Sequence, residues 1–230
     1  MIPLKRALSS PVGRKFVMSI SGIALVLFVI VHLLGNLTLY IPDGGDAFNR
    51  YAAGFEALGP ALYVIEMGLL AVIVVHIIWG IGTTLKNKKA RPDRYAGGAK
   101  SKGGPSHLSL LSKNMIVSGS ALLIFLVVHI WHFRVRKVTD AEKTELNGEE
   151  VTDLYALVET AFHHPGWVAF YTISMLFLGF HLRHGFWSAF QSLGAMKPEW
   201  SKGIYALGLV VAVLLTVGFL GIPIYMYAMQ

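Results

Sequence analysis

Five long apolar runs dominate this chain of 230 residues and limit what it can fold into. A bilayer core of about 30 Å takes about 20 helical residues to cross. Hydrophobic residues make up 54% of the chain and charged residues 14%, which is too apolar for a soluble domain of this size. We expect an all-α integral membrane protein, a single domain of residues 1–230. Its five transmembrane helices should form a bundle over residues 15–40, 60–86, 113–136, 166–192 and 202–228.

The first apolar run follows four basic residues, Lys5, Arg6, Arg14 and Lys15, as a secretory signal would. No Ala-x-Ala cleavage pattern ends this run, and His32 lies near its far end. We therefore expect the run to be retained as the first helix.

The charge of the loops predicts the orientation of the helices. Residues 86–113 hold eight lysines and arginines against one acidic residue, whereas the loops before and after them are acidic. Because cytoplasmic loops carry an excess of Lys and Arg, this basic segment and the N-terminus should be cytoplasmic. The same bias accounts for the net charge of +7, so nucleic acid is not an expected partner. The acidic segment after the third run should end in a short amphipathic surface helix.

Each of the first four runs contains a histidine, and the predicted topology gives these four residues related depths. His32 and His129 lie past the middle of helices that enter from the inside, so they share an outer level. His76 and His181 lie about 16 residues into helices that enter from the outside, so they share an inner level. Ionisable groups in hydrocarbon are costly and are functional by default, so the four histidines form two candidate sites.

Two axial imidazoles on one iron are typical of a b-type haem that lies between helices and transfers electrons. The sequence therefore predicts two haem b groups, an inner one on His76 and His181 and an outer one on His32 and His129. At a rise of 1.5 Å per residue the two irons would lie roughly 15 Å apart, close enough for fast electron tunnelling. The chain has no cysteine, which excludes covalent c-type haem and Cys-ligated iron–sulfur clusters.

Other interpretations of the histidines remain open at this point. His132 and His184 each follow a proposed ligand by three residues, so each is an alternative ligand or a partner for a haem propionate or a quinone. A lone membrane histidine is more often a packing residue than a ligand, and matched depths are what favour haem. The competing functions are a free-standing two-haem transmembrane reductase and a transporter with histidine proton relays. A transporter should show helices broken at the midplane, and no such interruption is visible.

The chain resembles the cytochrome b membrane-anchor subunit of succinate dehydrogenase and fumarate reductase, in its five-helix, two-haem bacterial form. The resemblance covers nearly the whole chain and rests on HLLGNL, DAFNRYAAGF, HLRHGFWSAFQSLG and one histidine in each of the first four helices. It implies that His76 and His181 hold the haem nearer the iron–sulfur subunit, and that His32 and His129 hold the distal haem. It also implies residence in the inner (cytoplasmic) membrane. The partners would be a flavoprotein with FAD and an iron–sulfur protein, docked on residues 86–113.

In this resemblance the chain performs no dicarboxylate chemistry and exchanges electrons with a membrane quinone, with menaquinone favoured. Quinone reduction consumes two protons, so the quinone site needs a proton-exchanging group. Glu66, within the second helix, and Glu56, in the outer loop, are the candidates. Arg183 is a candidate partner for a haem propionate, unless it extends to the interface. Some family members carry a glutamate two residues before the fourth-helix ligand as a proton route, and here that position is Gly179.

Overall fold

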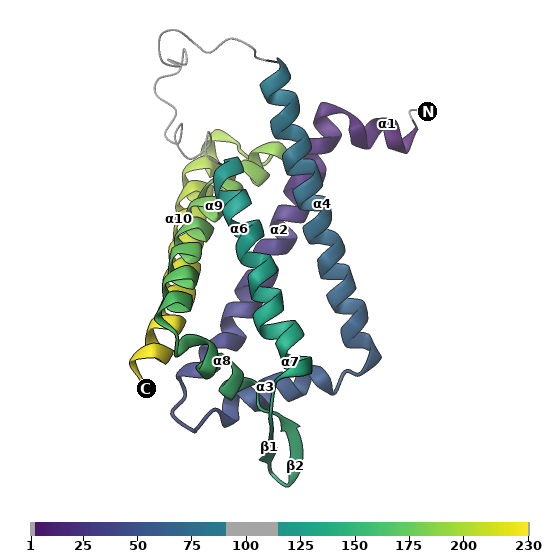
Figure 1. The fold of residues 1–230 in the computed structure, drawn as a ribbon. Coiled ribbons are helices and arrows are strands. Elements are labelled where there is room, and N and C mark those ends of the chain that lie inside the picture. Colours follow the sequence, from purple (N-terminus) through teal and green to yellow (C-terminus); the bar gives the residue numbers. More distant parts are fainter. Residues whose placement is uncertain (1–2, 91–114, 230) are drawn as a thin grey trace.

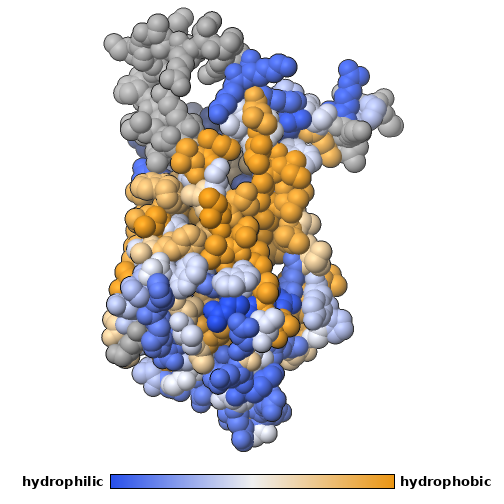
Figure 2. Space-filling view, in the orientation of Figure 1, coloured by the Kyte–Doolittle hydropathy of each residue, from blue (hydrophilic) through white to orange (hydrophobic). Residues whose placement is uncertain are grey.

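The computed structural model describes residues 3–90 and 115–229, and within them five helices are long and apolar enough to cross a membrane. Their bounds are α2 (Pro11–Asn36), α4 (Pro60–Ala90), α6 (Met115–Ile130), α9 (Pro165–Ser192) and α10 (Pro198–Ala228). The third span continues from α6 through a π-helical turn, η2 (Trp131–Val135), into α7 (Arg136–Thr139). Figure 2 shows an apolar band across the middle of the molecule with hydrophilic residues gathered at both ends. The chain is a multi-pass membrane protein, as the sequence predicted.

Local sequence explains where the long helices begin. The Ser10 side chain accepts a hydrogen bond from the backbone N–H of Gly13 at 3.0 Å, and Pro11 occupies the first turn of α2. His164 caps α9 in the same way, and Pro165 follows it. These caps start α2 at Pro11, four residues earlier than predicted, because capping and not hydrophobicity decides the first turn.

The helices are arranged as a bundle with two distinct ends (Figure 1). Helices α2 and α9 pack against each other at its centre, α4 packs on α2, α6 packs on α9, and α10 packs mainly along α9. The amino end carries α1 (Leu4–Ser9) and the link from α9 to α10. The hairpin end carries the β-hairpin, α7 and the C-terminus. Helices α2 and α6 run toward the hairpin end, and α4 and α9 run back.

The hairpin end contains structure that the sequence analysis did not predict. Helix α3 (Asp46–Glu56) follows a short 3₁₀ turn, η1 (Leu37–Tyr40), within the expected loop. Strands β1 (Lys143–Leu146) and β2 (Glu149–Thr152) form an antiparallel hairpin. Its two-residue turn is Asn147–Gly148, both with positive φ, as a type I′ turn requires. The surface helix expected in this segment is α8 (Leu154–Phe162).

A buried asparagine joins α3 to α8. Asn49, on α3, is 3% exposed, donates from Nδ2 to Asp153 Oδ1 at 2.9 Å and accepts at Oδ1 from the backbone N–H of Tyr155 at 2.8 Å. Asp153 in turn caps α8 by accepting from the backbone N–H of Ala156. Because a buried amide is costly unless it is paired, these bonds fix α3 and α8 as one layer below the bundle.

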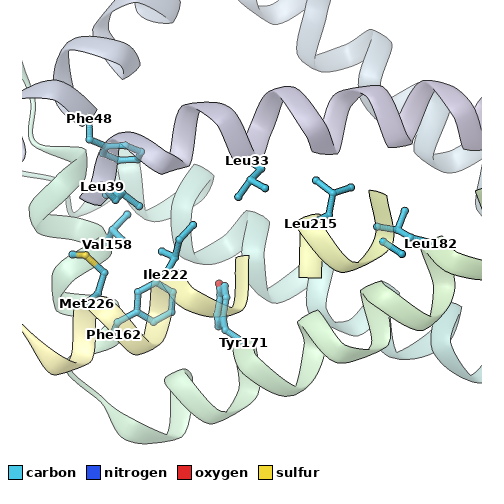
Figure 3. Close-up of a cluster of buried hydrophobic side chains, with 11 residues drawn as sticks. Leu33, Leu39, Phe48, Val158, Phe162, Tyr171, Leu182, Leu215, Ile222 and Met226 are labelled. Carbon is cyan, nitrogen blue, oxygen red and sulfur yellow. The ribbon is translucent and has the colours of Figure 1, made fainter. Parts of the chain in front are cut away.

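The apolar core lies where α2, α9 and α10 meet the hairpin-end helices (Figure 3). Glycines let α10 approach its neighbours closely, as small residues do between membrane helices. A Cβ at Gly218 would lie 2.6 Å from Leu33 Cδ2 of α2, and one at Gly208 would lie 2.9 Å from Phe186 Cδ1 of α9. Both neighbours belong to other helices, so these glycines are contact points of the bundle.

Gly218→Ala should therefore lower the melting temperature of the protein in detergent, because the new methyl group meets the buried Leu33 side chain. Overpacking of this kind costs about 1–3 kcal/mol. Gly203→Ala, in the same helix, is the matched control, since nothing lies within 4 Å of a Cβ there. Adding Leu33→Ala to Gly218→Ala should cost less than the sum of the two single changes. Strict additivity would contradict the contact.

Candidate functional site

The structure brings together the same two histidine pairs that the depth argument grouped. His32 on α2 and His129 on α6 have ring centres 5.8 Å apart, with planes at 88°. His76 on α4 and His181 on α9 have ring centres 6.3 Å apart, with planes at 65°. We call His76 and His181 the inner pair, and His32 and His129 the outer pair. Their role as ligands stays a prediction.

Both separations fit two imidazoles on opposite sides of one metal. A metal–imidazole bond is about 2 Å long, so two such ligands have ring centres about 6 Å apart. In the described ranges, 3–90 and 115–229, no group of three or more His, Cys, Asp or Glu side chains could hold a metal ion. The donor sets available there are pairs of imidazoles, which suits an iron whose other ligands come from a porphyrin.

The inner pair has a matching polar neighbour on each side. Ser21 Oγ on α2 lies 3.2 Å from His76 Nδ1, and Ser118 Oγ on α6 lies 3.1 Å from His181 Nδ1. A glycine follows each serine. A Cβ at Gly22 or Gly119 would lie 3.5 Å from Cε1 of the same histidine, so each imidazole rests against bare helix backbone. The sequence analysis did not predict that either serine contacts a histidine.

The outer pair lies among aromatic rings. His32 stacks on Phe28 with ring centres 5.4 Å apart, and His129 stacks on Phe125 at 5.3 Å. Phe133 contacts His129 edge-on. His129 Nδ1 is buried and has no hydrogen-bond partner among the described residues. The outer imidazoles are thus surrounded by apolar rings where the inner ones meet hydroxyl groups.

The two additional histidines are placed differently. His132 is 1% exposed, is hydrogen-bonded through Nδ1 to the Tyr171 hydroxyl at 3.1 Å and packs edge-on against Trp167. Both partners lie on α9 and neither is a histidine, so these contacts give the alternative-ligand interpretation no support. His184 Nδ1 and Trp187 Nε1 are both buried and lack hydrogen-bond partners in the part of the chain that the structure describes. Their ring centres lie 5.0 Å apart, near the carboxyl end of α9, which is at the amino end of the bundle.

The two candidate carboxylates for the quinone lie on one pocket at the hairpin end, about 390 Å³ in volume. Glu66 accepts two hydrogen bonds from Arg134, at 2.9 and 3.0 Å, and Glu56 pairs with Lys137 at 2.7 Å. Burial on its own raises the pKa of Glu56, but the hydrogen bond and charge of Lys137 outweigh it and hold this pKa below its usual range. Glu56 is therefore ionised at neutral pH, and Glu66 shares its pocket with three cations, Arg134, Lys137 and Lys143.

Gly179, two residues before His181, packs against helix α10. A Cβ at this position would overlap Thr216 Oγ1 of α10. Gly179 is therefore a contact point between α9 and α10. Arg183 is half-buried one turn or less from His181, and no ion pair joins it to another described residue.

The proposed docking segment, residues 86–113, lies mostly outside the described residues. Its first part is the end of α4, where Lys86, Lys88 and Lys89 are exposed at the amino end. His163 and His164, at the hairpin end, are exposed and bond to nearby backbone, so they do not belong to either pair.

The chain is 26% identical over 165 residues to the succinate dehydrogenase cytochrome b558 subunit of Bacillus subtilis (strain 168). The match covers 70% of this chain and 69% of that protein. No family model matches the chain, and no solved structure does. The resemblance inferred from the motifs is thus confirmed at the level of distant similarity.

Proposed function

We propose that this chain is the membrane-anchoring cytochrome b subunit of a succinate:quinone oxidoreductase and holds two b haems. In this role it relays electrons between an iron–sulfur subunit and a membrane quinone. The observation that carries the proposal is the pairing of four histidines from four helices into two sites at two depths of one bundle. The similarity to a succinate dehydrogenase cytochrome supports it independently.

The inner pair would hold one haem and the outer pair the other. Bound haem supplies one-electron transfer, and the protein supplies ligands, orientation and a medium of low dielectric constant. The imidazoles provide the iron ligands, and the aromatic rings around His129 keep water from the outer site. His184 and Trp187 are suited to a propionate of the inner haem, because each has a buried polar nitrogen that lacks a partner among the described residues. Arg183, next to His184 in the sequence, is the candidate for an ion pair with that propionate.

The amino end would face the cytoplasm. The charged residues described there are mostly basic, among them Arg6, Arg14 and Lys15 and the lysines that end α4. Cytoplasmic ends carry such an excess. The flavoprotein and the iron–sulfur subunit would dock on this side, on residues 86–113. Electrons would then enter at the inner haem and leave at the outer one, or the reverse, in the inner (cytoplasmic) membrane.

The quinone, with menaquinone favoured, would react at the hairpin-end pocket beside the outer haem. At this position the quinone would need the outer haem to receive electrons, because the soluble partners would dock at the opposite end of the bundle. Glu66 is the first candidate for proton exchange and Glu56 the second, since both line the pocket. Arg134 and Lys137 would stabilise the negative charge that develops on a quinone oxygen during reduction.

Purification through a tag on this chain from native membranes tests the proposal. The expected result is a complex with a flavin subunit and an iron–sulfur subunit, in which succinate reduces haem absorbance bands and an added quinone reoxidises them. A chain that purifies alone, with haem reduced by ascorbate and not by succinate, would instead identify a free-standing reductase. A chain without haem in fresh membranes would favour proton transport or a plain anchor.

A further inference from the structure

Two serines from different helices make the same contact with the inner pair. Ser21 Oγ lies 3.2 Å from His76 Nδ1, and Ser118 Oγ lies 3.1 Å from His181 Nδ1. Both serines are buried, at 6% exposure each. The contact therefore takes place where water does not compete for the imidazole nitrogen.

The direction of these hydrogen bonds follows from the serine protons. Ser21 Oγ donates to the backbone carbonyl of Val17 at 2.8 Å, and Ser118 Oγ donates to that of Met115 at 3.2 Å. A hydroxyl has one proton to donate and two lone pairs to accept with. With each proton on a helix carbonyl, each oxygen can accept a hydrogen bond from Nδ1–H. The Nε2 atom of both imidazoles is then unprotonated, which is the state that binds a metal.

The two serines occupy equivalent positions in the sequence. Ser21–Gly22 on α2 and Ser118–Gly119 on α6 each precede the outer histidine of the same helix by the same interval, since His32 and His129 each follow their serine by eleven residues. Both helices run from the amino end to the hairpin end (Figure 1). Each helix thus offers a hydroxyl to the inner pair and an imidazole to the outer pair. A contact that recurs in both halves of the bundle is a built feature and not an accident of one side chain.

The outer pair has no equivalent contact at His129. Its Nδ1 atom is buried without a hydrogen-bond partner in the described ranges, and its ring stacks on Phe125. Metal-bound histidines generally donate their other ring N–H to an oxygen, which orients the ring and increases the basicity of the ligand. The inner and outer sites therefore differ in the hydrogen bonding of the histidine Nδ1 atoms, which would tune the reduction potential of a bound iron.

We infer that Ser21 and Ser118 are positioning residues that hold His76 and His181 in the ligating tautomer and lower the reduction potential of the inner haem relative to the outer one. A more basic imidazole stabilises the oxidised iron, so accepting the Nδ1 proton favours the oxidised state. The inference rests on the proposed function, because it needs haem at the inner pair. The serines act through the imidazoles and touch no reacting group themselves.

A redox titration of the purified complex tests the inference, with haem absorbance as the readout. Ser21→Ala and Ser118→Ala should each keep two haems per chain and raise the potential of the inner haem alone. We expect the equilibrium constant for its reduction to rise about tenfold per serine, which is about 59 mV for a one-electron couple. The electron paramagnetic resonance signal of the oxidised inner haem should shift in the same variants. Ser21→Thr, which restores a hydroxyl, should return the potential toward the wild-type value.

Two other buried serines provide matched controls. Ser19 on α2 and Ser174 on α9 donate to backbone carbonyls of their own helices, at 2.8 and 2.7 Å, and make no recorded contact with a histidine ring among the described residues. Ser19→Ala and Ser174→Ala should leave both potentials unchanged.

The possible outcomes separate this inference from the proposed function. An inner potential that stays at the wild-type value, or an equal shift in both haems, would overturn the inference while two haems keep the proposed function in place. Equal loss of both haems in a serine variant would also overturn the inference. Absence of haem from the wild-type complex would end the proposed function itself.

Discussion

His181→Ala is expected to yield a chain that binds one b haem in place of two and no longer reduces quinone from succinate. The change removes one imidazole of the inner pair and would leave His76 as the single histidine ligand of the proposed inner haem. Electrons from the cytoplasmic partner would then have to cross to the outer haem without the inner one. Haem per chain, measured as the pyridine haemochrome, should halve, and quinone reduction should fall more than about 100-fold, because proximity of the redox groups is lost.

His184→Ala is the matched control for this variant. It removes a buried imidazole from the same helix, three residues further on, but one that does not contact His76 in the structure. It should keep both haems and weaken, at most, the binding of the inner one. Loss of a haem in His184→Ala and not in His181→Ala would show that the register of the fourth helix is assigned wrongly.

Glu66→Gln is expected to reduce quinone turnover by about 100-fold while both haems remain bound, the lower range of what a positioned acid or base contributes. Glutamine cannot exchange a proton and cannot reproduce the paired contact with Arg134. The measurement is the rate of quinone reduction by succinate in the intact complex, with haem content determined on the same sample. The side chains of this ion pair are 39% and 36% exposed, so its loss should cost only about 0–1 kcal/mol of stability.

Glu56→Gln distinguishes the two carboxylates of the pocket. The lowered pKa keeps Glu56 ionised at neutral pH, and Glu56 lies in the loop region outside the second span, so its removal should slow turnover less than Glu66→Gln does. A larger loss of quinone turnover in Glu56→Gln than in Glu66→Gln would make Glu56 the first candidate for proton exchange. Wild-type turnover in both variants would contradict a quinone site at the hairpin end.

The sequence was sufficient for the features that depend on position along a helix. Five apolar runs predicted five spans, and counting residues from the membrane borders grouped His32 with His129 and His76 with His181 before their contact was known. This worked because depth in a membrane is nearly proportional to residue number in a helix. Both histidines of a pair then need only face the bundle interior to meet.

Features that depend on helix rotation or on distant partners were not predictable in this way. Ser21 lies 55 residues from His76, and Glu66 lies 68 residues from Arg134, so neither pairing has a local signal. Depth alone does not give the angle at which a side chain leaves its helix. The equal spacing of Ser-Gly and His in α2 and α6 is visible in the sequence. Without the contacts of the two serines with His76 and His181, it does not indicate what the serines do.

The β-hairpin and helix α3 were missed for a different reason. Asn147–Gly148 between two short runs is a strong hairpin signal, and Asn49 ties α3 to α8 through buried hydrogen bonds. These elements are short and polar, so hydropathy, which finds the membrane spans, treats them as loop. Their prediction would have required attention to turn chemistry within the segments between the spans.

The most direct test of the account is the number of haems bound by the wild-type chain. A pyridine haemochrome assay on the purified complex, with the chain quantified in the same sample, should give two protohaem groups per chain. Two are expected because each histidine pair would supply two imidazole ligands to one iron. A value of one would leave one pair as packing residues, and a value of zero would contradict the electron-relay function altogether.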